Sequence, residues 1–378
     1  MKTPPQLPFL TFICKLGEGG MSSVWKAFDI RHEEMLAVKI LNREQTARPD
    51  DIELFQAEAR TMSEINHVGI VRSYELNCHD GWWYYTMEYV DGYSFSSLLK
   101  RKQHLPEADC LLICESVAVA LDYAWNDFGV VHCDIKPDNI MINSDGTVKL
   151  TDLGLCHTFQ YLAEGTQRIP DQVMGTPAYI SPEQVFGDVE PDCRTDIYSL
   201  AATLYHLSTG RIIFPGLGYE EMLRAHCDEN CAGHDPRFYR PELSEGFCQM
   251  LEAMLVKNRD YRIPSWNDVY EMCLAVERGS VFKHREGTAS SLRLALSGAQ
   301  YAEQAGLDAA SAPPDGYDAI PGPRPVPQPK KHVMRFFTHA GARREPQIQI
   351  DPETGRKVLV RHKAVNAGFK VHKPVTDW

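Results

Sequence analysis

Val-Val-His-Cys-Asp-Ile-Lys-Pro-Asp-Asn, residues 130–139, is the most informative stretch of this 378-residue chain. It places His132, Asp134, Lys136 and Asn139 within eight residues. The spacing has a chemical reason, because one carboxylate can accept a hydroxyl proton while an amide oxygen a short turn away holds a metal ion. The stretch is therefore a candidate catalytic loop, in which a carboxylate and an amide lie within a short turn of each other.

A glycine-rich segment lies upstream, where residues 16–24 read Leu-Gly-Glu-Gly-Gly-Met-Ser-Ser-Val. Gly17 and Gly19 have no Cβ, so the backbone amides at these positions can approach phosphate oxygens closely. Glycine-rich turns are common, so this segment predicts a phosphate-binding loop only in combination with other motifs.

A lysine within an apolar strand is the next chemical signal. Lys39 ends the run Ala37-Val38-Lys39, 15 residues beyond Val24. Because a lysine in such surroundings needs an anionic partner, we expect a carboxylate beside it. Glu58, on a predicted helix, is the best candidate, and Glu53 on the same helix is the competing choice.

Strand-like and helical patterns divide the chain near residue 90. Before it, short β-branched or apolar runs are interrupted by one helical pattern at 51–65. After Asp91-Gly92, helical spacing dominates the segments 94–100, 107–128, 192–209, 219–226, 244–255 and 266–276. A small strand-rich lobe followed by a larger helical lobe predicts a ligand cleft between them.

Together these motifs resemble the protein kinase family, whose catalytic loop carries His-Arg-Asp with an Asn five residues after the Asp. Asp152-Leu153-Gly154 takes the place of the family's Asp-Phe-Gly motif, and Pro182-Glu183 that of Ala-Pro-Glu. The resemblance covers residues 9–277 and is closest to bacterial kinases of the eukaryotic Ser/Thr type.

The resemblance implies an α+β, two-lobed protein-kinase-like fold with a partly disordered C-terminal extension. The β-rich N-lobe would span 9–90 and the helical C-lobe 91–277. The implied cofactors are ATP and Mg²⁺, and the implied activity is phosphoryl transfer to Ser/Thr hydroxyls of protein substrates. The catalytic residues would be Asp134, Lys136, Asn139 and Asp152, of which Asn139 and Asp152 would hold Mg²⁺. The ATP-binding residues would be Leu16, Gly17, Gly19, Gly20, Val24, Ala37, Lys39, Glu58, Glu88, Val90 and Met141.

Two features favour a Ser/Thr kinase over a Tyr kinase. Lys136 is one, and the segment Gly-Thr-Pro-Ala-Tyr at 175–179 is the other. The resemblance implies that Thr176 hydrogen-bonds near Asp134 and Lys136. It also implies supporting roles outside the chemistry, with Glu183 paired to Arg262 and Asp196 binding the catalytic-loop backbone.

Cys133 is the departure that sets this catalytic loop apart. Most family members have Arg there, and that Arg pairs with a phosphorylated residue of the activation loop. Cysteine cannot form this charge-assisted bond. We therefore expect activity that does not depend on a phosphate docking at this point, although Thr158 and Thr166 are available in the loop.

The composition excludes several classes of protein. No run approaches the 18 or more apolar residues of a membrane span, and the N-terminus lacks a signal-peptide core, which favours a cytoplasmic protein. The 11 cysteines form no C-x-x-C pair, which favours reduced thiols. One cluster could in principle bind zinc, and it consists of His226, Cys227, Cys231 and His234. The favoured interpretation is that these are buried thiols with incidental histidines, and a zinc site is the less favoured one.

The charge and proline patterns set the C-terminal region apart. Residues 278–329 are expected to form a linker, with an amphipathic helix at 290–305 and seven prolines in 311–329. Residues 330–378 carry a net charge of +7 and the rest of the chain −19. The acidic body argues against nucleic acid as a partner, whereas the basic tail is a candidate docking segment. Alternating runs at 347–351 and 357–362 favour a small β-hairpin.

Two other functions remain open on the sequence. A small-molecule phosphotransferase of the same fold shares the H-x-D-x-x-x-x-N core, but Lys136, Thr176 and the Pro182-Glu183 segment argue for a polypeptide substrate. A non-enzymatic ATP-binding scaffold would recruit partners through its tail. An intact set of catalytic groups disfavours this second alternative.

Overall fold

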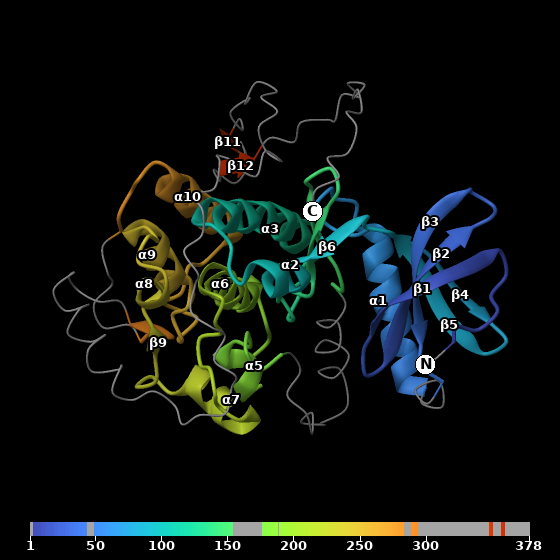
Figure 1. Ribbon diagram of the computed structural model, residues 1–378, viewed down its shortest axis with the longest axis horizontal. Helices are drawn as coiled ribbons and strands as arrows, with labels where there is room; N and C mark the ends of the chain where they lie inside the picture. The colour runs from blue at the N-terminus through green and yellow to red at the C-terminus, as the bar shows by residue number, and fades with distance from the viewer. Residues whose placement is uncertain are drawn as a thin grey trace. The chain divides into compact units, whose positions relative to one another are not determined.

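The computed structural model describes residues 3–43, 49–153, 176–187, 189–282 and 289–293, and the backbone of two short strands at 348–350 and 357–359. The chain divides into a first unit, Met1–Pro321, and a second unit, Gly322–Trp378. Within the first unit a strand-rich N-lobe precedes a helical C-lobe (Figure 1). The predicted two-lobed α+β fold is confirmed.

The N-lobe is built on an antiparallel sheet with the strand order β1-β2-β3-β5-β4. Its elements are β1 (Leu10–Glu18), β2 (Ser22–Asp29), β3 (Glu34–Leu41), α1 (Pro49–Glu64), β4 (Ser73–His79) and β5 (Trp82–Glu88). Helix α1 packs on one face of the sheet through Phe55 and Ala59. Leu7 covers the other face. Because side chains alternate along a strand, Tyr84 packs in the cluster of Leu7 and Tyr85 in that of Phe55.

The C-lobe is mainly helical, and its long helix α3 packs against α6 and α10 (Figure 1). Its elements are β6 (Gly92–Ser94), α2 (Phe95–Lys102), α3 (Glu107–Phe128), β7 (Ile140–Asn143), β8 (Val148–Leu150), α5 (Pro182–Phe186), α6 (Cys193–Thr209), α7 (Tyr219–Cys227), β9 (Gly233–His234), α8 (Pro236–Tyr239), α9 (Glu245–Met254), α10 (Trp266–Glu277) and β10 (Leu292–Arg293). Helix α3 ends at Gly129, whose positive φ forms a left-handed cap. None of the helices in the described residues is long and apolar enough to span a membrane.

Backbone contacts join the two lobes beside the catalytic loop. The Val71 amide donates to the carbonyl of Leu150 on β8, and the Leu150 amide donates to Gly69. Ile70 forms an isolated bridge to Leu150, and strand β4 begins only at Ser73. The segment before β4 is thus tied to the C-lobe.

A segment beyond the predicted kinase domain packs into the C-lobe. The helix expected at 290–305 does not begin at Ser290, because β10 is a strand that pairs with β9. The Ser291 amide donates to the Leu255 carbonyl, and the Ser291 hydroxyl lies 2.6 Å from that of Tyr198. These contacts, with the burial of Leu292, outweigh the helical pattern of the sequence. The rest of the predicted helix lies outside the described residues.

We expect Leu292→Ala to lower the free energy of unfolding by about 2–5 kcal/mol, the usual cost of truncating a fully buried leucine. Leu292 is 2% exposed and belongs to the main C-lobe cluster. Urea denaturation measures the change. Val281→Ala is the matched control, because Val281 is 58% exposed and its truncation removes little packing. Equal stability of the two variants would contradict the packing of this segment.

The second unit contributes one described feature. Strand β11 (Ile348–Ile350) pairs antiparallel with β12 (Lys357–Leu359), with Ile348 opposite Leu359. This pairing lies where the alternating runs favoured a hairpin. The remaining residues of the basic tail lie outside the described part of the chain.

Candidate active site

The catalytic loop lies between α3 and β7 and is held from beneath by helix α6. Asp196, in the first turn of α6, accepts hydrogen bonds from the His132 amide at 2.5 Å and the Cys133 amide at 2.7 Å. Burial raises the pKa of Asp196 to about 6, whereas these donors favour the charged carboxylate. The backbone contact predicted for Asp196 is present, and it explains how a loop with Cys133 at φ 63° is kept in place.

Asp134 is the centre of a compact polar network. Its Oδ2 accepts a hydrogen bond from Lys136 Nζ at 2.6 Å, and its Oδ1 accepts one from the Thr176 hydroxyl at 2.9 Å. Lys136 Nζ also donates to Thr176 Oγ1 at 2.8 Å. The predicted meeting of Thr176 with Asp134 and Lys136 is thus present. The carboxylate is fixed on both oxygens and is 9% exposed.

Asn139 and Asp152 supply the oxygen atoms of the predicted metal site. Asn139 Nδ2 donates to the Asp134 carbonyl at 2.9 Å and to its carboxylate at 3.2 Å, so the amide oxygen is the atom of this side chain that could bind a metal ion. Lys39 lowers the pKa of Asp152 below its ordinary value, against the opposing effect of burial, so this residue is a carboxylate at neutral pH. One carboxylate and one amide fit Mg²⁺, which prefers oxygen ligands and retains waters and phosphate oxygens.

The zinc interpretation receives no support from the structure. Among the described residues no group of three or more His, Cys, Asp or Glu side chains could hold a metal ion. His226 Nδ1 instead lies 2.7 Å from the Tyr198 hydroxyl, and the His234 ring stacks on Phe238. The two histidines have structural partners.

Lys39 is paired with two carboxylates from different elements. Its Nζ lies 2.6 Å from Glu58 Oε1 on α1 and 2.9 Å from Asp152 Oδ1. Burial opposes the charge on Lys39, but Asp152 and Glu58 raise its pKa well above the ordinary value. Glu58, which was favoured over Glu53, is the partner. The lysine is therefore a fixed cation close to the predicted metal ligand.

Four of the predicted ATP-binding residues meet in one apolar cluster. Ala37 and Val90 are buried in it, and Val24 and Met141 pack against it. In the glycine-rich loop, a Cβ added at Gly17 or Gly20 would meet no atom within 4 Å, and one at Gly19 only the Ser22 carbonyl at 3.6 Å. Leu16 is 47% exposed in the same loop. The Glu88 carboxylate is engaged elsewhere, 2.8 Å from Lys149 Nζ.

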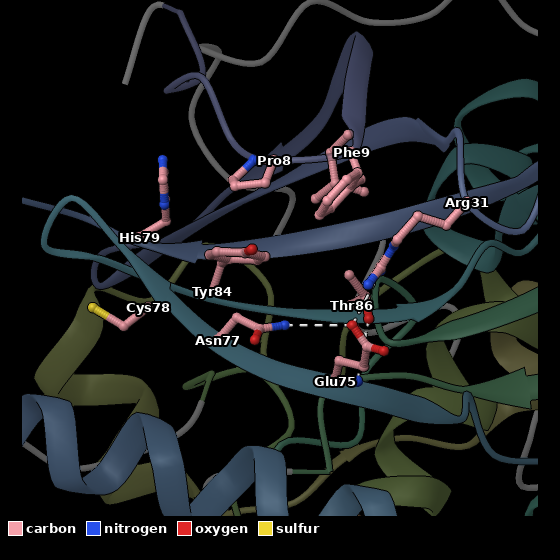
Figure 2. A pocket seen from close by; sticks show the side chains of 10 residues that line it. Pro8, Phe9, Arg31, Glu75, Asn77, Cys78, His79, Tyr84 and Thr86 are labelled. Atoms are coloured by element: carbon pink, nitrogen blue, oxygen red, sulfur yellow. Dashed lines mark hydrogen bonds and ion pairs between the residues drawn. The ribbon is translucent and has the colours of Figure 1, made fainter.

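Two cavities of the structure lie away from this cluster. One of about 200 Å³ opens on the outer face of the N-lobe sheet, where Phe9, Arg31 and Tyr84 line it (Figure 2). The other, of about 540 Å³, lies between α9 and α10. Neither is the cleft predicted between the lobes, which stays a prediction.

The cysteines divide into two states. Nine of them among the described residues are free thiols, as the composition predicted. Cys133 differs, because its sulfur is disulfide-bonded, and the expectation of reduced thiols is wrong for this residue. Its carbonyl accepts a hydrogen bond from Gln184 Nε2 at 2.8 Å, which joins the catalytic loop to α5.

A buried ion pair supports the segment that carries Thr176. Arg262 Nη1 lies 2.7 Å from Glu183 Oε1, and the two side chains are 0% and 5% exposed. The Thr195 hydroxyl donates to the same carboxylate at 3.0 Å. Burial alone would raise the pKa of Glu183, but Arg262 lowers it below the ordinary value. The pair predicted from the sequence is confirmed.

One residue at the site was missed by the sequence analysis. Tyr85 donates a hydrogen bond from its hydroxyl to Glu58 Oε1 at 2.8 Å. Strand β5 is aromatic or apolar on both faces, so its pattern does not tell which of Tyr84 and Tyr85 faces Lys39. The antiparallel pairing of β3 with β5, which sets Lys39 opposite Tyr85, decides it.

Known proteins are similar to this chain in sequence. The protein kinase domain model matches residues 10–273, and the chain belongs to the protein kinase family. Serine/threonine-protein kinase PknA of Mycobacterium tuberculosis H37Rv is 36% identical over 270 residues, which are 70% of this chain and 60% of that kinase. Serine/threonine-protein kinase PrkC of Bacillus subtilis is 35% identical over 201 residues, 53% of this chain and 30% of that kinase.

Solved structures show the same fold. The crystal structure of the Mycobacterium tuberculosis PknI kinase domain aligns with a TM-score of 0.54 at 24% sequence identity, covering 73% of this chain and 98% of that domain. The chain spans about 60% of the length of PknA. The similarity to PknA therefore covers only part of that kinase.

Proposed function

We propose that the chain is an ATP- and Mg²⁺-dependent protein kinase that phosphorylates Ser and Thr residues of proteins, with Asp134 as the catalytic base. The observation that carries the proposal is the network in which Lys136 and Thr176 hold the two carboxylate oxygens of Asp134. A base fixed on both oxygens is pre-oriented for a hydroxyl group. The names of the relatives, which are Ser/Thr kinases, support the same substrate class.

The residues divide the reaction between them. The hydroxyl oxygen of a substrate Ser or Thr attacks the γ-phosphorus of ATP, the bond to the β,γ-bridging oxygen breaks, and ADP leaves. Asp134 accepts the hydroxyl proton, and Lys136 neutralises charge on the transferring group. Lys39 binds the α- and β-phosphates. Asn139 and Asp152 would hold Mg²⁺, which neutralises the phosphate oxygens when it is bound.

Adenine would bind in the apolar cluster of Val24, Ala37, Val90 and Met141. The glycine-rich loop would cover the phosphates, because Gly17 and Gly20 leave open space above their backbone. An apolar cluster beside a fixed lysine matches an adenine base joined to a polyphosphate.

A small-molecule phosphotransferase is less well supported. Such an enzyme shares the Asp134 and Asn139 core, but it does not require the contact between Thr176 and Lys136. That contact brings the segment beginning at Thr176 to the catalytic base, where a peptide substrate would lie. The buried pair of Glu183 and Arg262 stabilises the same segment.

Transfer of labelled phosphate tests the proposal. The protein is incubated with γ-labelled ATP, MgCl₂ and a generic protein substrate, and acid hydrolysis identifies the labelled amino acids. We expect label on phosphoserine and phosphothreonine that disappears when EDTA removes Mg²⁺. The absence of transfer to protein, or label confined to tyrosine, would overturn the proposal.

We further propose that Cys133 makes activity independent of an activation-loop phosphate. The double variant Thr158→Ala/Thr166→Ala, at positions outside the described residues, should retain most of its activity, because Cys133 offers no cation for a phosphate. Initial rates of protein phosphorylation measure this. Thr176→Ala serves as a positive control, because it removes a hydrogen bond to Asp134 and should slow transfer. A large loss in the double variant would refute the idea.

A further inference from the structure

Tyr85 lies at the centre of the N-lobe beside the Lys39–Glu58 ion pair. It faces Lys39 across the β3–β5 pairing and is 2% exposed. Its ring packs against Phe55 of α1 with a centroid distance of 5.2 Å. Lys39 Nζ lies 5.8 Å from the Tyr85 ring centroid. The residue thus touches the strand that carries the lysine and the helix that carries its carboxylate partner.

The hydroxyl of Tyr85 is directed at the carboxylate itself. It donates to Glu58 Oε1 at 2.8 Å, and the same oxygen accepts from Lys39 Nζ at 2.6 Å. Burial and the charge of Glu58 raise the pKa of Tyr85 well above its ordinary value, so the phenol keeps its proton. A phenol that stays protonated in buried surroundings is a permanent donor to this oxygen.

We propose that Tyr85 is a positioning residue, whose hydroxyl fixes the rotamer of Glu58 so that the carboxylate holds Lys39 toward the nucleotide phosphates. The inference rests on the proposed function and assigns Tyr85 a role in it. Two donors on one carboxylate oxygen restrict the side chain more than the lysine alone does, because Lys39 also contacts Asp152 at 2.9 Å. The Tyr85 hydroxyl gives Glu58 a second hydrogen bond, from a residue of the N-lobe sheet.

Tyr85→Phe tests the proposal, because it removes the hydroxyl and keeps the ring that packs on Phe55. We expect kcat/KM for ATP to fall about 10- to 100-fold, the loss that follows removal of a hydrogen bond to a charged group. Tyr84→Phe is the matched control, one residue earlier on the same strand. Tyr84 lines the outer cavity of the N-lobe (Figure 2) and packs in the cluster of Leu7, not in that of Tyr85, so this variant should match wild type.

A double-mutant cycle separates positioning from packing. In a Glu58→Gln background, Tyr85→Phe should cause a much smaller further loss, because the carboxylate that the hydroxyl orients is gone. Full additivity of the two losses would overturn the proposal. So would a Tyr85→Phe variant that equals Tyr84→Phe in kcat/KM.

Binding of Mg·ADP, measured by calorimetry, keeps this inference distinct from the proposed function. If wild-type protein transfers no phosphate, the proposed function fails. The affinity for Mg·ADP then still tests whether the Tyr85 hydroxyl positions Glu58 and Lys39. We expect Tyr85→Phe to bind Mg·ADP more weakly than wild type and Tyr84→Phe to bind it equally. Equal affinity of all three proteins would overturn the role of Tyr85.

Discussion

Asp134→Asn should lower kcat for protein phosphorylation by about 10²- to 10⁴-fold, the range over which general bases contribute to catalysis. Asparagine has nearly the same shape but cannot take the proton from a substrate hydroxyl. It also removes the negative charge that Lys136 Nζ contacts at 2.6 Å. Initial rates with saturating ATP and protein substrate measure the effect, and the affinity for Mg·ADP should change far less than kcat.

The control for this experiment is Asp138→Asn, the same chemical change four residues further along the loop. Asp138 is exposed, in contrast to Asp134, so its substitution should leave kcat near the wild-type value. Thermal unfolding of both variants shows whether the loop keeps its structure. If Asp134→Asn retained wild-type kcat, Asp134 would not be the catalytic base.

Glu183→Gln should lower the free energy of unfolding by about 3–5 kcal/mol, because it leaves the guanidinium of Arg262 buried without its counter-ion. Arg262 has no exposed side-chain surface. Its Nη1 and Nη2 atoms each donate a hydrogen bond to the Glu183 carboxylate, at 2.7 and 3.0 Å. Urea denaturation measures the loss. Phosphoryl transfer should fall as well, since this pair supports the segment that carries Thr176.

An exposed ion pair offers the contrast for this prediction. Asp260 lies 3.1 Å from Arg194 Nη1, but its side chain is 76% exposed. Asp260→Asn should therefore cost no more than about 1 kcal/mol. A similar loss in both variants would show that burial does not set the strength of the Glu183–Arg262 pair.

The pH dependence of stability provides a second measurement on Glu183. Arg262 lowers the pKa of Glu183 in the folded state, whereas the glutamate of the unfolded chain keeps its ordinary pKa of 4.5. The folded state therefore favours the charged carboxylate more than the unfolded chain does. The stabilisation is complete above that value and declines as the pH falls through the lowered pKa of the folded state. The stability difference between wild type and Glu183→Gln should shrink in that acid range.

Most of the fold was predictable because local patterns and tertiary packing agree. The helix predicted at 107–128 coincides with α3, where apolar periodicity and the left-handed cap at Gly129 act together. The prediction of a helix at 290–305 was wrong at its start, because there the local pattern and the tertiary packing disagree. Ser290, Ser291 and Leu292 have a helical pattern, but the C-lobe offers them a strand partner and buried hydrogen-bond acceptors.

In the catalytic loop, too, some features were predictable from the sequence and others were not. The contacts among Asp134, Lys136 and Asn139 were predictable because the three residues are close in sequence. The state of Cys133 was not, because a disulfide depends on a residue that the fold brings near.

The sequence by itself determined the protein kinase family and the two lobes, because these follow from short motifs and local periodicity. It favoured Glu58 over Glu53 as the partner of Lys39 through the family resemblance, whereas only the tertiary structure decided that Tyr85 donates to the same carboxylate. That contact depends on the rotation of α1 and the register of β3 with β5. Register is set by the packing of whole faces, which no single residue type encodes.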